Sequence, residues 1–364
     1  MGVFDERIKE LEEEISKTKY NKRTQHHIGL VKAKLAKLQE KKEARESSKG
    51  KIRGYEVKKT GDGTVVLLGY PSVGKSTLLN SLTNAESKTA PYAFTTISVV
   101  PGILIYNGAK IQILDIPGIV KGASKGTGKG REALSILRSA DLILILVDVN
   151  YPEHLEILKK ELFDSKIRIN QKKPDVKIVK KTKDGISLSI TKKLTKIDTE
   201  TLKDVLREFG YVNADVVIRE DIDIDQLIDI IENNRKYVPS IIVINKIDTV
   251  NSDKGKEVIK KLNADIAISA EKKINIDELK ELIFSKLNIL RIYMKEPGKE
   301  PDLEIPLIMF NGCTIQDVCN KLHKDFVRRF KFARVWGASS KFPGQKLQLN
   351  HKLADKDILE LHLN

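Results

Sequence analysis

The chain has 364 residues, of which 65 are Lys or Arg and 50 are Asp or Glu, a formal net charge of +15. That length predicts two or three domains, and 40% hydrophobic with 32% charged residues excludes wholesale disorder. No apolar run reaches the 18 residues of a membrane span, and the charged N-terminus does not resemble a secretory signal. Only Cys313 and Cys319 are present, too few for a disulfide framework. We therefore expect a cytoplasmic protein without a membrane-bound part.

An N-terminal helical hairpin is predicted for residues 1–50, from two sets of apolar residues at helical spacing. These are Phe4, Ile8, Leu11 and Ile15, followed by Ile28, Val31, Leu35 and Leu38. Residues 16–60 hold 15 Lys or Arg against four Glu, a net charge of +11. This run is either a solvated helix face or a surface for a polyanion, and its size favours RNA.

A doubly wound, mostly parallel α/β sheet is predicted for residues 60–290, where short apolar runs alternate with helix-length segments. The expected strands are Thr64–Leu68, Ile103–Tyr106, Ile111–Leu114, Leu142–Val147, Ile241–Ile244 and Ala264–Ile268.

A small α+β subdomain at residues 170–239 is expected to interrupt this sheet domain. Asp175–Lys181 and Ile186–Thr191 flank Asp184-Gly185, which predicts a β-hairpin. Helices at Leu202–Phe209 and Ile224–Ile231 and a strand at Ala214–Ile218 should complete the subdomain. A Pro- and Gly-rich linker then leads to a final α+β module at residues 291–364.

A phosphate-binding loop is predicted at residues 69–76, between a strand and a helical segment beginning at Thr77. Its residues, Gly69-Tyr70-Pro71-Ser72-Val73-Gly74-Lys75-Ser76, fit G-x-x-x-x-G-K-[ST]. The glycines let backbone N–H groups converge on phosphate oxygens at the helix N-terminus. Lys75 would neutralise the β- and γ-phosphates, and the Ser76 hydroxyl would bind Mg²⁺.

Two further motifs follow predicted strands. In Asp115-Ile116-Pro117-Gly118, the Asp115 carboxylate would hold Mg²⁺ through water, and the Gly118 N–H would contact the γ-phosphate. In Asn245-Lys246-Ile247-Asp248, the Asp248 carboxylate would accept the N1–H and 2-amino hydrogens of guanine, which adenine lacks. Ser269-Ala270 would bring a backbone N–H to guanine O6. Motifs in this order at strand ends predict GTP binding.

The chain resembles the developmentally regulated GTP-binding (DRG) proteins, relatives of the Obg GTPases. The resemblance rests on GYPSVGKSTLLN, AFTTISVVPG, DIPGIVKGASKGTGKG and NKID, and the end of the chain resembles a TGS module of the β-grasp fold. It implies that Thr96 binds Mg²⁺ and γ-phosphate. The adjacent Thr95 is the alternative for this role, should the alignment be shifted by one residue. The resemblance also implies association with translating ribosomes and a dedicated partner protein.

Hydrolysis is expected to be slow, because Ile119 occupies the place where Ras-like enzymes carry a water-orienting Gln. Either K⁺ or a basic side chain would supply the missing charge. Some relatives respond to K⁺, but the Asn that binds it in several such loops is Ser72 here. The leading hypothesis is a monomeric GTP-hydrolysing switch acting on a ribosome or RNA, with Lys75, Thr96 and Gly118 as catalytic residues. The alternatives are an RNA-binding assembly factor with structural nucleotide and, disfavoured by Asp248, a metabolic kinase.

Overall fold

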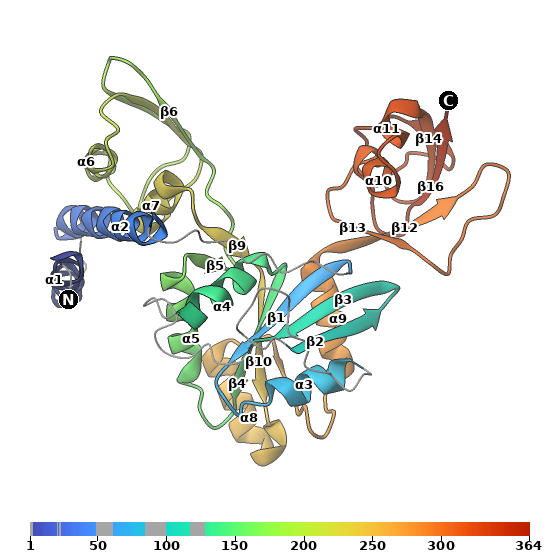
Figure 1. The fold of residues 1–364 in the computed structure, drawn as a ribbon, viewed down its shortest axis with the longest axis horizontal. Coiled ribbons are helices and arrows are strands. Elements are labelled where there is room, and N and C mark those ends of the chain that lie inside the picture. The colour runs from blue at the N-terminus through green and yellow to red at the C-terminus, as the bar shows by residue number, and fades with distance from the viewer. Residues whose placement is uncertain (1–2, 20, 22, 49–60, 84–99, 117–127) are drawn as a thin grey trace. The chain divides into compact units, whose positions relative to one another are not determined.

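The computed structural model describes residues 3–19, 21, 23–48, 61–83, 100–116 and 128–364 (Figure 1). The chain divides into two compact units. Unit 1 combines Met1–Gly54 with Gln171–Tyr237, and unit 2 combines Tyr55–Asn170 with Val238–Asn364.

A six-stranded sheet forms the centre of unit 2, in the order β11-β10-β4-β1-β3-β2. Every pairing is parallel except that of β2 with β3. This confirms the predicted mostly parallel α/β sheet, with each strand within a few residues of its expected place. The strands are β1 (Gly63–Gly69), β2 (Val100–Tyr106), β3 (Ala109–Asp115), β4 (Leu142–Asp148), β10 (Ser240–Asn245) and β11 (Ile266–Ala267).

Helices cover both faces of this sheet because its central strands are apolar on both sides. Val65 and Leu67 of β1 pack with α3 (Lys75–Leu82) and α9 (Ile276–Leu287), while Val66 and Leu68 pack in a second core with α4 (Gly128–Ser139) and α5 (His154–Asp164). A third core holds α8 (Ser252–Leu262) against β10 and β11. Since parallel strands end at one edge, the loops after β1, β3, β4 and β10 all lie at that edge.

The end of the chain forms a five-stranded sheet in the order β13-β12-β16-β14-β15. Helix α10 (Ile315–Leu322) packs Ile315, Val318 and Cys319 against it, and both cysteines are buried and free. A parallel pair, β12 with β16, within antiparallel neighbours fits the expected β-grasp module. The remaining elements are β12 (Ile289–Lys295), β13 (Leu307–Phe310), α11 (Phe326–Arg329), β14 (Phe330–Trp336), β15 (Gln345–Leu347) and β16 (Ile358–Leu363).

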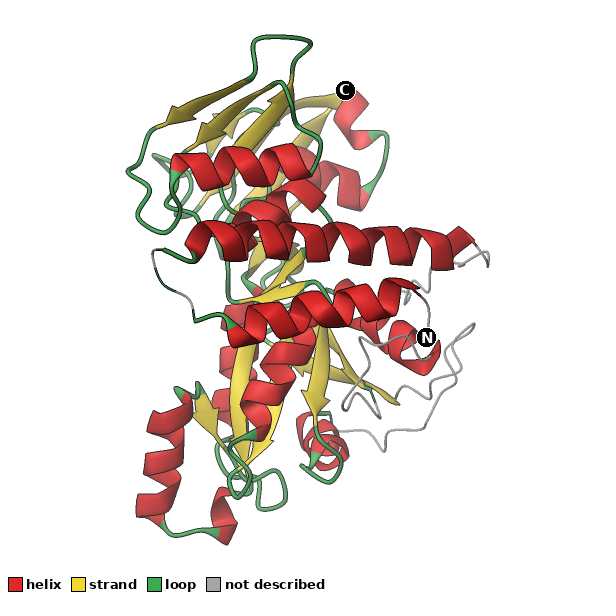
Figure 2. Cartoon of the chain, turned by 90° about the vertical axis from the view of Figure 1, so that its left-hand side faces the viewer, coloured by secondary structure: helices red, strands yellow, loops and turns green. Residues whose placement is uncertain are grey.

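Unit 1 joins the N-terminal helices to the inserted segment through one apolar core. Helix α1 (Val3–Lys17) packs on α2 (Gln25–Ser48), at 24 residues the longest helix among the described residues (Figure 2). Ala33 and Ala36 of α2 are buried with side chains of α6 (Thr199–Glu208) and α7 (Ile224–Glu232). The predicted helical hairpin is therefore present, and α2 is also part of the insert's core.

The predicted β-hairpin around Asp184-Gly185 is wrong. Strands β6 (Val176–Lys180) and β7 (Ile186–Ile190) do not pair with each other, because β8 (Ala214–Ile218) lies between them. It pairs antiparallel with β6 and parallel with β7. Asn213 stabilises this arrangement, since its Oδ1 accepts from the Gly185 N–H at 2.8 Å and its Nδ2 donates to the Thr182 carbonyl.

The two short strands β5 (Ile167–Ile169) and β9 (Lys236–Val238) form a separate two-stranded sheet. Among the helices that the structure describes, none has both the length and the apolar character needed to cross a membrane.

Candidate nucleotide-binding site

The loop between β1 and α3 has the backbone of a phosphate-binding loop. Ser72 and Gly74 both have positive φ, at 62° and 99°, and Gly74 directly precedes α3. A Cβ at Gly74 would come within 2.4 Å of the Asn245 Nδ2, so only glycine fits between the loop and Asn245. Within the loop Val73 is buried, while Pro71 and Ser72 are exposed, and Thr77 lies exposed in the first turn of α3.

Lys75 turns back over the loop. Its Nζ donates to the carbonyls of Gly69 and Tyr70, at 3.1 and 3.0 Å, and burial lowers the pKa of its ammonium group. The Tyr70 ring stacks on the His154 ring at 3.9 Å, and its hydroxyl is buried without a hydrogen-bond partner in the described part of the chain. An anion bound at the start of α3 would lie near the buried Lys75 ammonium and would stabilise its charged form.

Ser76 and Asp115 lie together, as a Mg²⁺ site requires. The Ser76 Oγ donates to the Asp115 Oδ2 at 2.8 Å. Asp115 is 4% exposed, and among the described residues its Oδ1 has no hydrogen-bond partner. A buried, unpaired carboxylate oxygen is unfavourable, and its position beside a hydroxyl fits a hydrated hard cation. Ile116 is buried next to it, while Thr96, Pro117, Gly118 and Ile119 lie outside the described residues.

Asn245 ties the phosphate loop to the predicted base-binding loops. It is 2% exposed; its Nδ2 donates to the Val73 carbonyl at 2.8 Å, and its Oδ1 accepts from the Ala270 N–H at 3.0 Å. That Ser269-Ala270 brings a backbone N–H to guanine O6 stays a prediction. In this structure the Ala270 N–H donates to the Asn245 side chain.

Lys246 and Asp248 extend from the same loop in different directions. The Lys246 backbone has a φ of 65°, and its Nζ donates to the Ser72 carbonyl at 2.8 Å. The Asp248 carboxylate accepts a hydrogen bond from Ser269 and lies 3.5 Å from the Lys272 ammonium. Chiefly through the bond from Ser269, the pKa of Asp248 is lowered, so the carboxylate is ionised at neutral pH.

The comparisons with known proteins agree with this geometry. Residues 64–183 match a family model described as a 50S ribosome-binding GTPase, residues 183–289 match its C-terminal region, and residues 290–363 match the TGS domain. An uncharacterized GTP-binding protein of Methanocaldococcus jannaschii is 54% identical over 99% of this chain and 93% of its own length. The developmentally-regulated GTP-binding protein 2 homolog of Dictyostelium discoideum is 41% identical over 99% of both chains. The chain belongs to the DRG family.

A solved structure of similar fold agrees with the architecture of this DRG chain. The YchF GTPase of Schizosaccharomyces pombe is 15% identical, covers 84% of this chain and 99% of its own, and has a TM-score of 0.50.

The DRG sequence contains one site residue that the motifs do not reveal. Asp148, at the end of β4, pairs with the Lys246 Nζ at 2.8 Å and is 7% exposed. It also accepts hydrogen bonds from the backbone N–H and the Nδ2 of Asn150, at 2.9 and 3.2 Å. The Asn150 Nδ2 reaches the Thr249 Oγ1, which donates to the Lys246 carbonyl. The position of Asp148 at the end of an apolar parallel strand is the sequence signal that could have identified it as a site residue.

Proposed function

We propose that this DRG chain binds GTP and GDP with Mg²⁺ at the loop between β1 and α3. The observation that carries the proposal is the Ser76–Asp115 pair, with its unpaired carboxylate oxygen beside the loop that Asn245 and Lys246 brace. Bound Mg²⁺ would neutralise charge on the β- and γ-phosphates. Ser76 would bind the ion directly and Asp115 through water, with Thr96 proposed as the further ligand.

Guanine recognition is proposed for Asp248. Its ionised carboxylate accepts from the N1–H and 2-amino group of guanine, and the bond from Ser269 holds it in position. Two relatives that match 99% of the chain are named GTP-binding proteins, which supports the same base.

We further propose slow GTP hydrolysis that switches the protein between two states. The Gly118 N–H would contact the γ-phosphate, and Lys75 would stabilise charge in the transition state. Because Ile119 cannot orient water, K⁺ or a basic side chain would complete the reaction.

The proposed target of the switch is the ribosome or another RNA in the cytoplasm, where a monomer would act with a dedicated partner protein. The net charge of +15 supports a polyanionic target, and so does the description of the matched family model as a 50S ribosome-binding GTPase. In the alternative function the chain is an RNA-binding assembly factor, and the nucleotide only stabilises its fold.

Phosphate release from GTP tests the proposal and separates the alternatives. The purified full-length protein should be measured with Mg²⁺ in NaCl and in KCl, each with and without ribosomes. Lys75→Ala is the inactive reference. We expect slow release that KCl or ribosomes accelerate and that Lys75→Ala abolishes. Tight GTP binding without release in any condition would favour the structural role, and no GTP binding would refute the site.

A further inference from the structure

Charge in unit 1 is strongly divided along the chain. Residues 172–196 contain nine Lys and two Asp, a net charge of +7, whereas residues 198–232 contain eleven Asp or Glu and three Lys or Arg, a net charge of −8. The basic segment includes β6 and β7, and the acidic segment includes α6, β8 and α7.

The acidic helices are matched to the basic N-terminal helix. Lys32 of α2 pairs with Asp225 at 2.7 Å, Lys37 pairs with Glu208 at 3.5 Å, and His26 lies 2.9 Å from Asp204. Within the hairpin, Lys42 pairs with Asp5. Five lysines of α2 could contact RNA phosphates: Lys32, Lys34, Lys37, Lys41 and Lys42. Three of them are therefore in ion pairs, and Lys34 and Lys41 remain exposed.

The lysines of the basic segment have a different environment. Eight of the nine are exposed, and the exception, Lys181, pairs with Asp215 at 2.8 Å. In the described part of the chain, five of the exposed lysines have no carboxylate within ion-pair distance. These five are Lys177, Lys180, Lys183, Lys192 and Lys193. Their charge is available to a partner.

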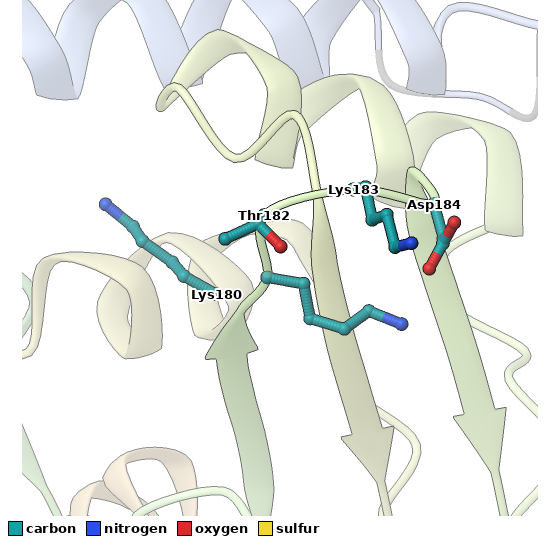
Figure 3. A pocket seen from close by; sticks show the side chains of 5 residues that line it. Lys180, Thr182, Lys183 and Asp184 are labelled. Carbon is teal, nitrogen blue, oxygen red and sulfur yellow. The ribbon is translucent and has the colours of Figure 1, made fainter.

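Strand order brings these lysines to one sheet. Since β6 is antiparallel and β7 parallel to β8, the end of β6 and the start of β7 lie at the same end of the sheet, on either side of β8. Lys180, Lys181 and Lys183 therefore lie at one end of the sheet and line an open hollow of about 520 Å³ with Thr182 and Asp184. The Lys180 side chain points away from Lys183, toward the Tyr211 ring (Figure 3). Lys192 and Lys193 follow the end of β7, at the opposite end. Five-residue strands separate the two groups by about 15 Å, at roughly 3.3 Å per residue.

The outward face between these ends is open. Ala214, Val216 and Ile218 point into the core, so the alternation turns Asp215 and Val217 outward. Their partners in register include Lys177, Val179, Ser187 and Ser189, all exposed. None of these side chains is aromatic, so the face offers no platform for stacked bases, and its lysines suit phosphates.

We propose that one surface of the β6-β8-β7 sheet, here called the lysine face, binds the phosphate backbone of double-helical RNA. Its basic residues are Lys177, Lys181, Lys183, Lys192 and Lys193. This proposal rests on the proposed RNA-directed function and specifies where the RNA binds: on the insert rather than on the hairpin. Each lysine that contacts a phosphate releases a counterion, so binding should weaken steeply with salt and show little dependence on base sequence.

The test compares three variants of the protein: one altered on the lysine face, one control with the same number of substitutions elsewhere, and one altered on α2. The face variant carries K177Q, K183Q, K192Q and K193Q, and leaves Lys180 and Lys181 intact because they contact Tyr211 and Asp215. The matched control carries K254Q, K256Q, K260Q and K261Q on the exposed side of α8. A third variant carries K34Q and K41Q on α2. Circular dichroism and GTP affinity establish that each variant is folded.

The probe is a 20-base-pair RNA duplex, with affinity measured at several KCl concentrations. We expect the face variant to lose at least ten-fold in affinity and up to about four units of salt slope, because each of its four lysines that no longer neutralises a phosphate lowers the slope by about one unit. GTP affinity should be unchanged.

Equal losses in the face variant and the α8 control, or a larger loss in the α2 variant, would overturn the assignment while the RNA-directed function stands. Native protein that binds GTP but no RNA would refute that function itself. Loss of affinity for poly(U) but not for the duplex would overturn the choice of double-helical RNA.

Discussion

Asp148 should control nucleotide affinity although it belongs to none of the recognised motifs. Its carboxylate holds the Lys246 ammonium against the Ser72 carbonyl, and Asn150 holds the carboxylate. Asp148→Asn keeps an acceptor for the Asn150 N–H but removes the charge that Lys246 needs. The phosphate loop and the base-binding loop then lose one of their connections.

The size of the effect follows from the exposure of the two partners. The Asp148 side chain is 9% exposed and that of Lys246 is 37% exposed. A hydrogen bond between charged groups contributes about 1.5–3 kcal/mol when buried, and exposed ion pairs contribute less than about 1 kcal/mol. A partly buried pair should therefore contribute about 1–2 kcal/mol, which corresponds to roughly five- to thirty-fold in Kd.

Equilibrium titration with fluorescent GDP and with a non-hydrolysable GTP analogue measures this effect. Both affinities should fall by the same factor, because Lys246 contacts the loop at Ser72 and no group assigned to the γ-phosphate. Asp148→Glu should restore part of the loss. Asp253→Asn, which removes an exposed carboxylate from α8, should change neither affinity. A loss confined to the triphosphate, or no loss at all, would refute the reasoning.

Four further predictions concern the motif residues. Asp248→Asn should weaken GTP binding ten-fold or more, at about 1.5–3 kcal/mol for charge-assisted bonds, and admit xanthosine triphosphate; competition binding measures both. Lys75→Ala and Ser76→Ala should weaken GTP more than GDP and stop turnover in a phosphate-release assay, and full activity in either would exclude Gly69–Ser76 as the active loop. Asn245→Ala leaves a buried carbonyl and N–H unpaired and should lower the free energy of unfolding by about 2–4 kcal/mol, read from urea titration. Because the pKa of Asp248 is lowered in the folded protein, its ionised form and GDP affinity should persist from pH 7 to 5 and decline only at more acid pH.

The sequence predicted strands and helices well where the signal was local. Apolar runs located all six strands of the main sheet, and helical spacing located α1, α2, α6 and α7. The Asp184-Gly185 turn failed as a guide to pairing because a turn signal describes only the adjacent chain. Both residues have the positive φ of a tight turn, at 77° and 67°, yet β8, almost thirty residues later, occupies the place between the strands.

Side-chain pairing between distant strands was also beyond the sequence. Spacing placed Asn245 and Ala270 in the same site, but only the fold shows that one bonds the other. Likewise, nothing in the sequence around β4 indicates that Asp148 neutralises Lys246, almost a hundred residues away. The charge count gave the hairpin most of the positive charge, whereas the partner of each charge depends on tertiary structure.

The ion pairs of the α2 lysines change how the positive charge of unit 1 is understood. A run of lysines on α2 is compatible with RNA binding and equally with a helix that docks on acidic neighbours. The ion pairs to Asp225 and Glu208, together with buried Ala33 and Ala36, assign much of α2 to docking. Electrostatic attraction to a polyanion depends on charge that is not already neutralised nearby. Among the described residues of unit 1, Lys177, Lys180, Lys183, Lys192 and Lys193 on β6, β7 and their connections carry such charge. A local charge count must therefore be corrected for pairing before it locates a binding surface.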